Sequence, residues 1–188
     1  MANLYYIIGG SGAGKDSLIN YIREHLPATA PIKIIQRYIT RPADAGGENH
    51  ISLSENQFLK MEELGCFSMN WFSHKTHYGI GTETTNWMHA DYNVIVNGSR
   101  GYLQDAIKTF PNIVPVLISV DPVVLSDRLF SRGREDYKEI QKRVAQAIQL
   151  EASVAHPHLK IIDNNGELEE AGSTLFKLIT NNVQHKCA

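Results

Sequence analysis

A glycine-rich turn near the start of the chain carries the residue types that bind phosphate. Gly9 and Gly14 are five residues apart and Lys15 follows directly, which satisfies the G-x-x-x-x-G-K part of a Walker A motif after an apolar run at residues 5–8. Glycines let backbone N–H groups approach an anion, the start of a helix favours negative charge, and the lysine ammonium can reach the terminal phosphates of a nucleotide. A turn that only joined a strand to a helix would need neither the lysine nor so many glycines. The predicted nucleotide-binding residues are Gly9, Gly10, Ser11, Gly12, Ala13, Gly14, Lys15, Asp16 and Ser17.

The residue after the lysine departs from this motif. Ser or Thr usually stands there and binds Mg²⁺, whereas this chain has Asp16 and then Ser17. Asp16 could bind the ion through its carboxylate, Ser17 could replace the usual hydroxyl, or Asp16 could simply favour the first turn of a helix through the helix dipole. We expect Asp16 and Ser17 to hold Mg²⁺, directly or through water.

Two groups of arginines supply further cationic side chains. Arg37 and Arg41 stand where a short predicted strand ends, and a second group surrounds Gly133. The second group consists of Arg128, Arg132, Arg134 and Arg143. Such a run is often a solvated helix surface with ion pairs to nearby acidic residues. In a chain that also has a phosphate-binding loop, it predicts a mobile lid over residues 127–146 that neutralises a transferring phosphoryl group and excludes water.

Short apolar strands alternate with helices along the chain, which indicates a parallel α/β sheet flanked by helices. The expected strands lie at residues 5–8, 32–35, 92–96, 113–120 and 159–162, and the main helices at 17–26, 101–110 and 167–179. Residues 37–82 contain two further short strands and a capped helix, so they predict a small β-rich insertion for the acceptor. We expect one domain over residues 1–188.

Composition limits the partners and the compartment. A formal net charge of −2 gives no general attraction to nucleic acid or to anionic membranes. The first residues lack the basic and apolar regions of a secretion signal, and no apolar run is long enough to span a bilayer, so we expect neither secretion nor membrane insertion. Cys66 and Cys187 lack the spacing of a zinc site and predict free thiols in a reducing cytosol. We therefore expect a cytoplasmic protein with a small-molecule substrate and without nucleic-acid or membrane partners, and the sequence does not define its oligomeric state.

Together these segments resemble the guanylate kinase-like branch of P-loop phosphotransferases over nearly the whole chain. The run G-G-S-G-A-G-K resembles the phosphate loop of that family, I-T-R-P with Gly47-Glu48 its acceptor-phosphate segment, and Tyr78-Gly79 its Tyr-Gly pair. The arginine run resembles its lid, and Asp163-Asn164-Asn165 resembles its nucleotide-base segment. The resemblance implies a P-loop NTPase fold that binds ATP with Mg²⁺, with Asn164 at the nucleotide.

The carboxylates with which a guanylate kinase recognises guanine are missing. Counting back from Tyr78, the usual Glu falls at or near Phe72, and the usual Asp is replaced by Asn97 or Gly98. A buried guanine edge without these acceptors would lose roughly 1–3 kcal/mol for each unpaired group. The pattern suits an acceptor that carries phosphate but no base.

The combination of G-A-G-K-D-S, R-Y-I-T-R-P, N-G-S-R and S-R-G-R-E-D resembles the ribose 1,5-bisphosphate phosphokinases of phosphonate breakdown. This resemblance implies that the γ-phosphate of ATP is transferred to the 5-phosphate of ribose 1,5-bisphosphate, giving 5-phospho-α-D-ribose 1-diphosphate and ADP. Arg37, Arg41, Tyr78 and Arg100 would hold the acceptor phosphates. Lys15 and the lid arginines would be catalytic.

Two alternative functions remain open at the level of the sequence. One is a guanylate kinase with an altered base pocket. The other is a non-catalytic guanylate kinase-like module that binds a phosphorylated protein segment, although the presence of Lys15 and of the arginine lid argues against it. Five histidines could be imagined as metal ligands, but they lack a partner carboxylate at motif spacing. They are His74, His77, His89, His156 and His158.

Overall fold

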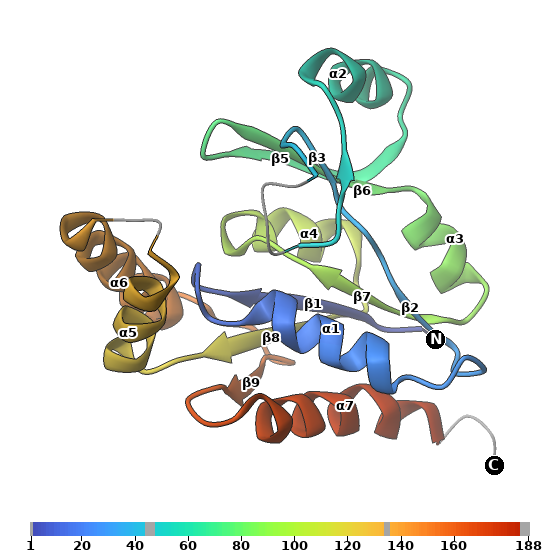
Figure 1. Cartoon of the computed structure of the whole chain (residues 1–188). Helices are drawn as coiled ribbons and strands as arrows, with labels where there is room; N and C mark the ends of the chain where they lie inside the picture. The colour runs from blue at the N-terminus through green and yellow to red at the C-terminus, as the bar shows by residue number, and fades with distance from the viewer. Residues whose placement is uncertain (1, 44–47, 134–135, 185–188) are drawn as a thin grey trace. The chain divides into compact units, whose positions relative to one another are not determined.

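The computed structural model describes residues 2–43, 48–133 and 136–184, except for the side chains of residues 150–151 and 182–184. The chain is organised in two compact units, each made from two separate stretches of sequence (Figure 1). Unit 1 contains Met1–Tyr6 and Ala30–Ile113, and unit 2 contains Ile7–Thr29 and Val114–Ala188. Gly47, Arg134 and Cys187, which the sequence analysis singled out, lie outside the described residues. The expectation of one domain over residues 1–188 stays a prediction.

The first strand, β1 (Leu4–Gly9), is divided between the two units. Residues 4–8 of β1 are fully buried. A strand of a parallel sheet that is covered on both faces reads as a continuous apolar run, and the run at residues 5–8 was the basis for predicting this strand. Its glycine end leads into the phosphate-binding turn.

Unit 1 contains one part of the parallel sheet, with the strand order β2-β7-β1. β2 (Ile32–Ile34) pairs in parallel with β7 (Asn93–Asn97), and Ile32 lies opposite Asn93. The start of β1 is joined to β7, because the Val94 N–H donates to the Asn3 carbonyl at 2.9 Å. The helices of this part are α3 (Glu83–His89), the 3-10 turn η1 (Arg100–Tyr102) and α4 (Leu103–Thr109).

Unit 1 also contains a second sheet with the strand order β4-β3-β6-β5. Its strands are β3 (Tyr38–Ile39), β4 (Ile51–Ser52), β5 (Phe67–Ser73) and β6 (Thr76–Gly81). Helix α2 (Glu55–Glu63) begins with a capping box between Ser54 and Gln57, the signal from which the sequence predicted it. All these elements lie within residues 37–82, the range predicted to be the β-rich insertion.

Unit 2 contains the other part of the parallel sheet, with the strand order β1-β8-β9. β8 (Ile113–Ser119) pairs in parallel with β9 (Lys160–Asp163), and Ile118 lies opposite Ile162. In the described part of unit 2 these strands are accompanied by the helices α1 (Lys15–His25), α5 (Pro122–Arg132), α6 (Tyr137–Ala152) and α7 (Leu168–Gln184).

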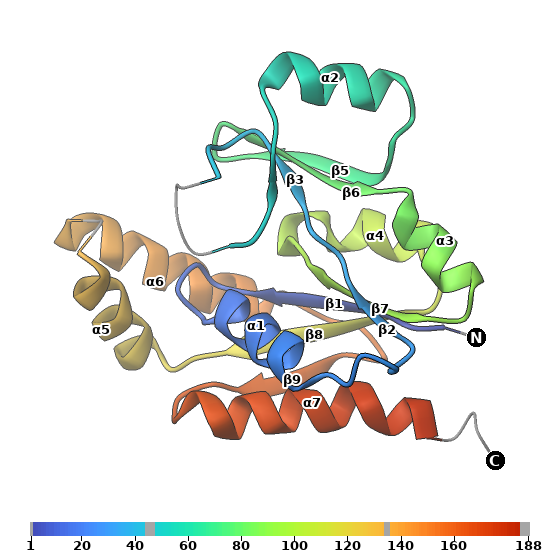
Figure 2. The same cartoon turned by 45° about the vertical axis from the view of Figure 1, so that its right-hand side comes forward.

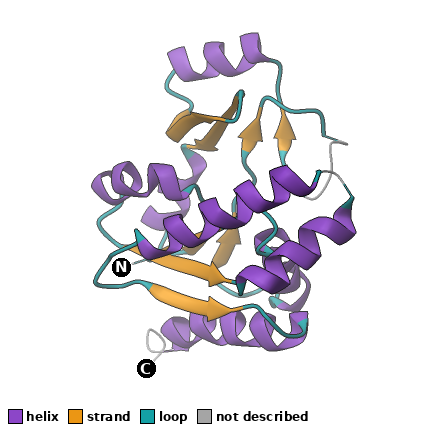
Figure 3. Cartoon of the chain, turned by 90° about the vertical axis from the view of Figure 1, so that its left-hand side faces the viewer, coloured by secondary structure: helices purple, strands orange, loops and turns teal. Residues whose placement is uncertain are grey.

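The helices of unit 2 pack in two pairs. Figures 1 and 2 show α1 beside α7, where Gly172 lies under the ring of Tyr21 and the Tyr21 hydroxyl donates to Glu169 at 2.8 Å. α5 and α6 pack against each other as a hairpin. Figure 3 shows the helices and strands joined by loops, and helices separate most strands of the parallel sheet along the chain, as the sequence predicted. The alternation is interrupted where β2, β3 and β4 follow one another and where α6 follows α5. No helix in the described part of the chain has the length and apolar character needed to cross a bilayer.

Candidate active site

The turn between β1 and α1 in unit 2 adopts a conformation that requires glycine. Gly12 and Gly14 have φ angles of 90° and 87°, in the left-handed region that favours glycine. A Cβ atom on Gly14 would also lie 2.4 Å from Nδ2 of Asn164, and one on Gly12 would lie 2.9 Å from the Leu129 side chain. The backbone angles and the lack of space for a side chain therefore both explain these glycines. The turn leads directly into α1, which begins at Lys15.

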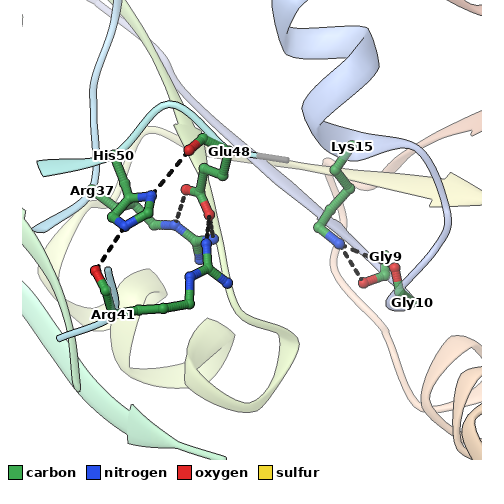
Figure 4. A network of polar contacts seen from close by, with 7 residues as sticks. All are labelled: Gly9, Gly10, Lys15, Arg37, Arg41, Glu48 and His50. Atoms are coloured by element: carbon green, nitrogen blue, oxygen red, sulfur yellow. Dashed lines mark hydrogen bonds and ion pairs between the residues drawn. The ribbon is translucent and has the colours of Figure 1, made fainter. Parts of the chain in front are cut away.

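Lys15 is the first residue of α1, and its side chain folds back over the turn. Its Nζ donates to the carbonyl oxygens of Gly9 and Gly10, at 3.1 Å each (Figure 4). The ammonium group is thus held above the loop whose N–H groups would surround a phosphate. The role of Lys15 as a cation that neutralises phosphate charge stays a prediction.

Asn164 contacts the phosphate loop rather than open space. This residue directly follows β9 and is buried, with 4% of its surface exposed. Its Nδ2 donates to the Ala13 carbonyl at 2.8 Å, and its backbone N–H donates to the Ser119 carbonyl at 2.9 Å. Asn164 therefore supports the loop backbone, and its expected contact with the nucleotide stays a prediction.

The two predicted metal ligands lie in the first turn of α1. Asp16 is half-buried and Ser17 is exposed. Among the described residues, no group of three or more His, Cys, Asp or Glu side chains converges on a metal-sized site. Mg²⁺ commonly binds through one or two protein oxygens together with substrate phosphates and water, and the oxygen donors of Asp16 and Ser17 beside a phosphate loop fit that pattern.

The predicted lid corresponds to α5 and α6, which lie against the phosphate loop within unit 2. Nη1 of Arg143 on α6 donates to the Ser11 hydroxyl at 2.9 Å. A Cβ atom on Gly10 would lie 3.2 Å from Cβ of Ala147, also on α6. Arg128 is half-buried on α5, and Arg132 is exposed at the end of that helix. The structure therefore brings Arg143 to the loop, and Arg132 remains on the surface.

Residues 37–82 of unit 1, predicted to bind the acceptor and called the acceptor region below, contain a buried ion pair (Figure 4). Arg37 donates through Nε to Oε1 of Glu48 at 2.5 Å and through Nη2 to Oε2, and both side chains are only 11% exposed. Nη2 of Arg41 lies 3.8 Å from the same Oε2. Nε of Arg41 is buried and has no hydrogen-bond partner among the described residues, so it is a donor that an acceptor phosphate oxygen would satisfy.

Aromatic rings form one wall of this region. Trp71 lies opposite Tyr78 in the pairing of β5 with β6, and their rings stack with centroids 5.5 Å apart. Trp71 also stacks with Tyr102, with ring centroids 5.4 Å apart. The guanidinium carbon of Arg37 lies 5.0 Å from the Tyr78 ring centroid, which is within cation–π distance.

The strand register corrects one detail of the sequence analysis. Phe72 was placed near the missing guanine-binding carboxylate, but it lies opposite His77 and therefore faces the other side of the sheet from Tyr78. On the Tyr78 face the next pair is Met69 with Ile80, and both side chains are buried and apolar. The part of β5 and β6 that faces the aromatic wall thus offers no carboxylate to a purine edge.

Arg100 is positioned by the turn after β7. The Tyr6 hydroxyl accepts from the Ser99 N–H at 3.0 Å and donates to the Ser99 carbonyl at 3.2 Å. Burial raises the pKa of Tyr6 above its ordinary value, so the hydroxyl stays protonated and can donate. A Cβ atom on Gly98 would lie 2.4 Å from the Tyr6 ring, which explains the glycine there. Asn97, at the end of β7, is buried.

No family profile matches the chain, so its class comes from solved structures and from relatives. The fold is that of the guanylate kinase-like P-loop proteins. A crystal structure of guanylate kinase from Anaplasma phagocytophilum superposes with a TM-score of 0.71 and 15% sequence identity, covering 96% of this chain and 85% of that chain.

The sequence relatives define the family more narrowly. The ribose 1,5-bisphosphate phosphokinase PhnN of Psychromonas ingrahamii is 47% identical over 178 residues, which cover 95% of this chain and 90% of the relative. Its namesake in Desulfomicrobium baculatum is 48% identical over 179 residues, which cover 95% of each chain. The chain belongs to the ribose 1,5-bisphosphate phosphokinase family. It is therefore a phosphotransferase enzyme, and the resemblance inferred from the sequence is confirmed.

Proposed function

We propose that this enzyme transfers the γ-phosphate of ATP to ribose 1,5-bisphosphate and forms 5-phospho-α-D-ribose 1-diphosphate and ADP. The observation that carries the proposal is the acceptor region of unit 1. Arg37 and Arg41 converge beside an aromatic wall, and the strand face next to Tyr78 holds apolar side chains where a guanine would need carboxylates. Such a region suits an acceptor with phosphate groups and no purine. Family membership at 47–48% identity supports the same substrate.

The product determines which phosphate of the sugar is attacked. 5-Phospho-α-D-ribose 1-diphosphate carries a diphosphate on C1 and a single phosphate on C5. The new P–O bond must therefore form at an oxygen of the 1-phosphate, and the 5-phosphate is the group held at a distance. The expectation that transfer occurs at the 5-phosphate is wrong, because phosphorylation there would place the diphosphate on C5 and not on C1.

The residues of the chain supply positioning and charge neutralisation. The nucleophile is an oxygen of an ionised phosphate, so no general base is needed. Loop N–H groups and Lys15 would hold the phosphates of ATP, and the lid arginine Arg143 would approach the transferring group from α6. Arg41 and Arg100 would bind acceptor phosphates.

Mg²⁺ is part of the proposal. Asp16 and Ser17 would hold it, because both offer oxygen donors at the start of α1 beside the phosphate loop. The ion would supply positive charge that offsets the negative charge of the ATP phosphates during transfer. We place the enzyme in the cytoplasm, where ATP is available.

Product identity tests the proposed function. The purified protein is incubated with ATP and Mg²⁺ and with either ribose 1,5-bisphosphate or GMP, and the products are followed by ³¹P NMR. We expect a new sugar diphosphate and ADP with the first acceptor, and little or no GDP with the second. Lys15→Ala serves as the matched control, because it removes the phosphate-loop cation alone.

Two results would overturn the proposal. Efficient GDP formation from GMP would make the enzyme a guanylate kinase with an altered base pocket. No turnover with either acceptor, in a folded protein that still binds ATP, would favour a non-catalytic module.

A further inference from the structure

Trp71 belongs to the aromatic wall of the acceptor region, and its ring has two stacking partners within the chain. The indole and the Tyr78 ring are almost parallel, with an angle of 7° between their planes and centroids 5.5 Å apart. The Tyr102 ring stacks on the same indole at an angle of 26° and a distance of 5.4 Å. Trp71 is half-buried. The indole therefore covers part of the aromatic surface of both tyrosines.

Neighbouring elements of unit 1 hold these three rings in place. Trp71 and Tyr78 lie opposite each other in the pairing of β5 with β6, so the strand register fixes their separation. Tyr102 comes from η1, and its hydroxyl has a hydrogen bond with the backbone of Asn70, the residue before Trp71. Helix α4, which follows η1, lies against β5. The indole is thus fixed from two sides of the chain and is not a freely rotating surface side chain.

The three rings lie next to a cation that the sequence predicted to bind an acceptor phosphate. The guanidinium carbon of Arg37 is 5.0 Å from the centroid of Tyr78 and 6.0 Å from that of Trp71. In a nucleoside monophosphate one sugar separates the phosphate from the base, so the base needs a flat surface near the phosphate-binding cations, and aromatic side chains commonly supply it. Indole and purine are both fused six- and five-membered rings. The side chain of Trp71 therefore has the shape of the base that it would displace.

We propose that Trp71 is a specificity-determining residue, whose indole occupies the aromatic surface on which the base of a purine nucleotide would stack. Specificity is a difference of affinities, and it often requires an element that excludes the competitor. The apolar pair of Met69 and Ile80 offers a purine no hydrogen-bond acceptor, and Trp71 removes the stacking surface. A ribose bisphosphate needs neither contact. The inference deepens the proposed function and rests on it, because it explains the choice of an acceptor without a base.

Purine binding is measured first, without catalysis. Wild-type enzyme, Trp71→Ala and Trp87→Ala are titrated with GMP and with AMP by calorimetry, in the presence of a saturating non-hydrolysable ATP analogue that occupies the phosphate loop. Trp87 is the matched control: it is the second tryptophan of the chain, its ring contacts Tyr92 at 5.0 Å and the Lys33 ammonium at 4.4 Å, and it lies on α3, outside the acceptor region. We expect Trp71→Ala to bind both nucleotides at least about tenfold more tightly than the other two proteins, the size of one base-stacking contact.

Acceptor selectivity is then measured by steady-state kinetics. We expect kcat/KM for GMP to rise about tenfold or more in Trp71→Ala and to stay at the wild-type value in Trp87→Ala. The KM for ATP should not change in either variant, because the phosphate loop belongs to unit 2. The value for GMP itself must rise. A selectivity that changes only because activity with ribose 1,5-bisphosphate falls would refute the proposal.

The titrations separate this inference from the proposed function. Unchanged purine affinity in a folded Trp71→Ala protein would overturn the inference, and weaker affinity than in the wild type would show that the indole is a platform for a base. If Trp71→Ala does not fold, Trp71→Val, which suits a strand, carries the same expectations. If the wild-type enzyme did not use ribose 1,5-bisphosphate at all, the proposed function would fail, and the titrations would still decide whether Trp71 excludes a purine.

Discussion

The buried pair between Arg37 and Glu48 allows a quantitative test of the acceptor region. Both side chains are 11% exposed, so replacing either one alone leaves an opposite charge buried without its main partner. Breaking a buried ion pair in this way costs about 3–5 kcal/mol, whereas replacing both partners by apolar residues is often neutral. The cation–π contact between Arg37 and Tyr78, at 5.0 Å, adds about 0.5–1 kcal/mol to the loss in any Arg37 variant.

The geometry predicts an order among three variants. Glu48→Leu should destabilise most, because it leaves Arg37 and Arg41 without their shared carboxylate. Arg37→Met should cost less, since Glu48 keeps Arg41 at 3.8 Å. The double variant Arg37→Met/Glu48→Leu should cost least, because it removes both charges of the most buried pair, and the remaining Arg41, which loses its carboxylate, is 32% exposed. The double-mutant cycle should therefore give a coupling free energy of several kcal/mol, about 3 or more.

Equilibrium unfolding in urea measures these effects. With a slope of about 2 kcal/mol per molar urea, a loss of 3–5 kcal/mol lowers the unfolding midpoint by roughly 1.5–2.5 M. The control is Lys60→Met, which breaks an exposed pair with Glu63 (side chains 64% and 70% exposed) and should shift the midpoint little. The reasoning is refuted if the double variant costs as much as the two single variants together, or if either single variant behaves like Lys60→Met.

Three further predictions concern the nucleotide site. Lys15→Ala should lower turnover by about 10²–10³ with an unchanged circular dichroism spectrum, and near-wild-type turnover would contradict the assignment of the phosphate loop. Asp16→Ala or Ser17→Ala should raise the Mg²⁺ concentration needed for half-maximal activity, and if neither does so the ion is held elsewhere. Asn164→Leu should raise the KM for ATP but not that for the acceptor, because it removes the donor to the Ala13 carbonyl. Equal effects on both KM values would indicate a general loss of structure.

Structural features that are determined by residues close together in the sequence could be predicted from the sequence. The strand before the phosphate loop, the cap at Ser54 and the end of a helix at Gly65 each follow from a local pattern of apolar, capping or glycine residues. Their types and approximate bounds agree with the structure. The alternation of strands and helices also predicted the fold class correctly, since it restricts how a parallel sheet can be connected.

The pairing inside the acceptor region could not be predicted in this way. Two donors of Arg37 are occupied by Glu48, a pairing that the sequence did not indicate, and the expectation that Arg37 binds a substrate phosphate stays a prediction. The pair exists because β3 and β4, strands of two residues each, lie side by side with Tyr38 opposite Ile51. Strands this short have no periodic signal, and their register depends on tertiary contacts. The same pairing brings His50 to the carbonyl of Arg41, which residue spacing alone does not indicate.

Asn164 shows the same limit in unit 2. An asparagine after a strand and before a helix is compatible with a turn, a cap or a ligand contact. Its contact with Ala13 follows from the strand order β1-β8-β9 and from the closeness of Gly14, where a side chain would leave no space for the asparagine amide. Strand order is a property of the whole chain, so the role of Asn164 emerged only from the structure.

The division of β1 between two units determines how long this strand stays unpaired while the protein is being synthesised. β1 is made first, but its neighbours β7 and β8 come later, and residues 10–92 must be synthesised before the first of them begins. At about 5–20 residues per second, this delay lasts roughly 4–17 seconds. During that time the six residues L-Y-Y-I-I-G, with no charge and no proline, have both strand edges unpaired and match the composition of aggregation-prone segments. A nascent chain that ends before residue 93 cannot bury this strand between its native neighbours, so a segment that is fully buried in the finished enzyme is open to intermolecular strand pairing during translation.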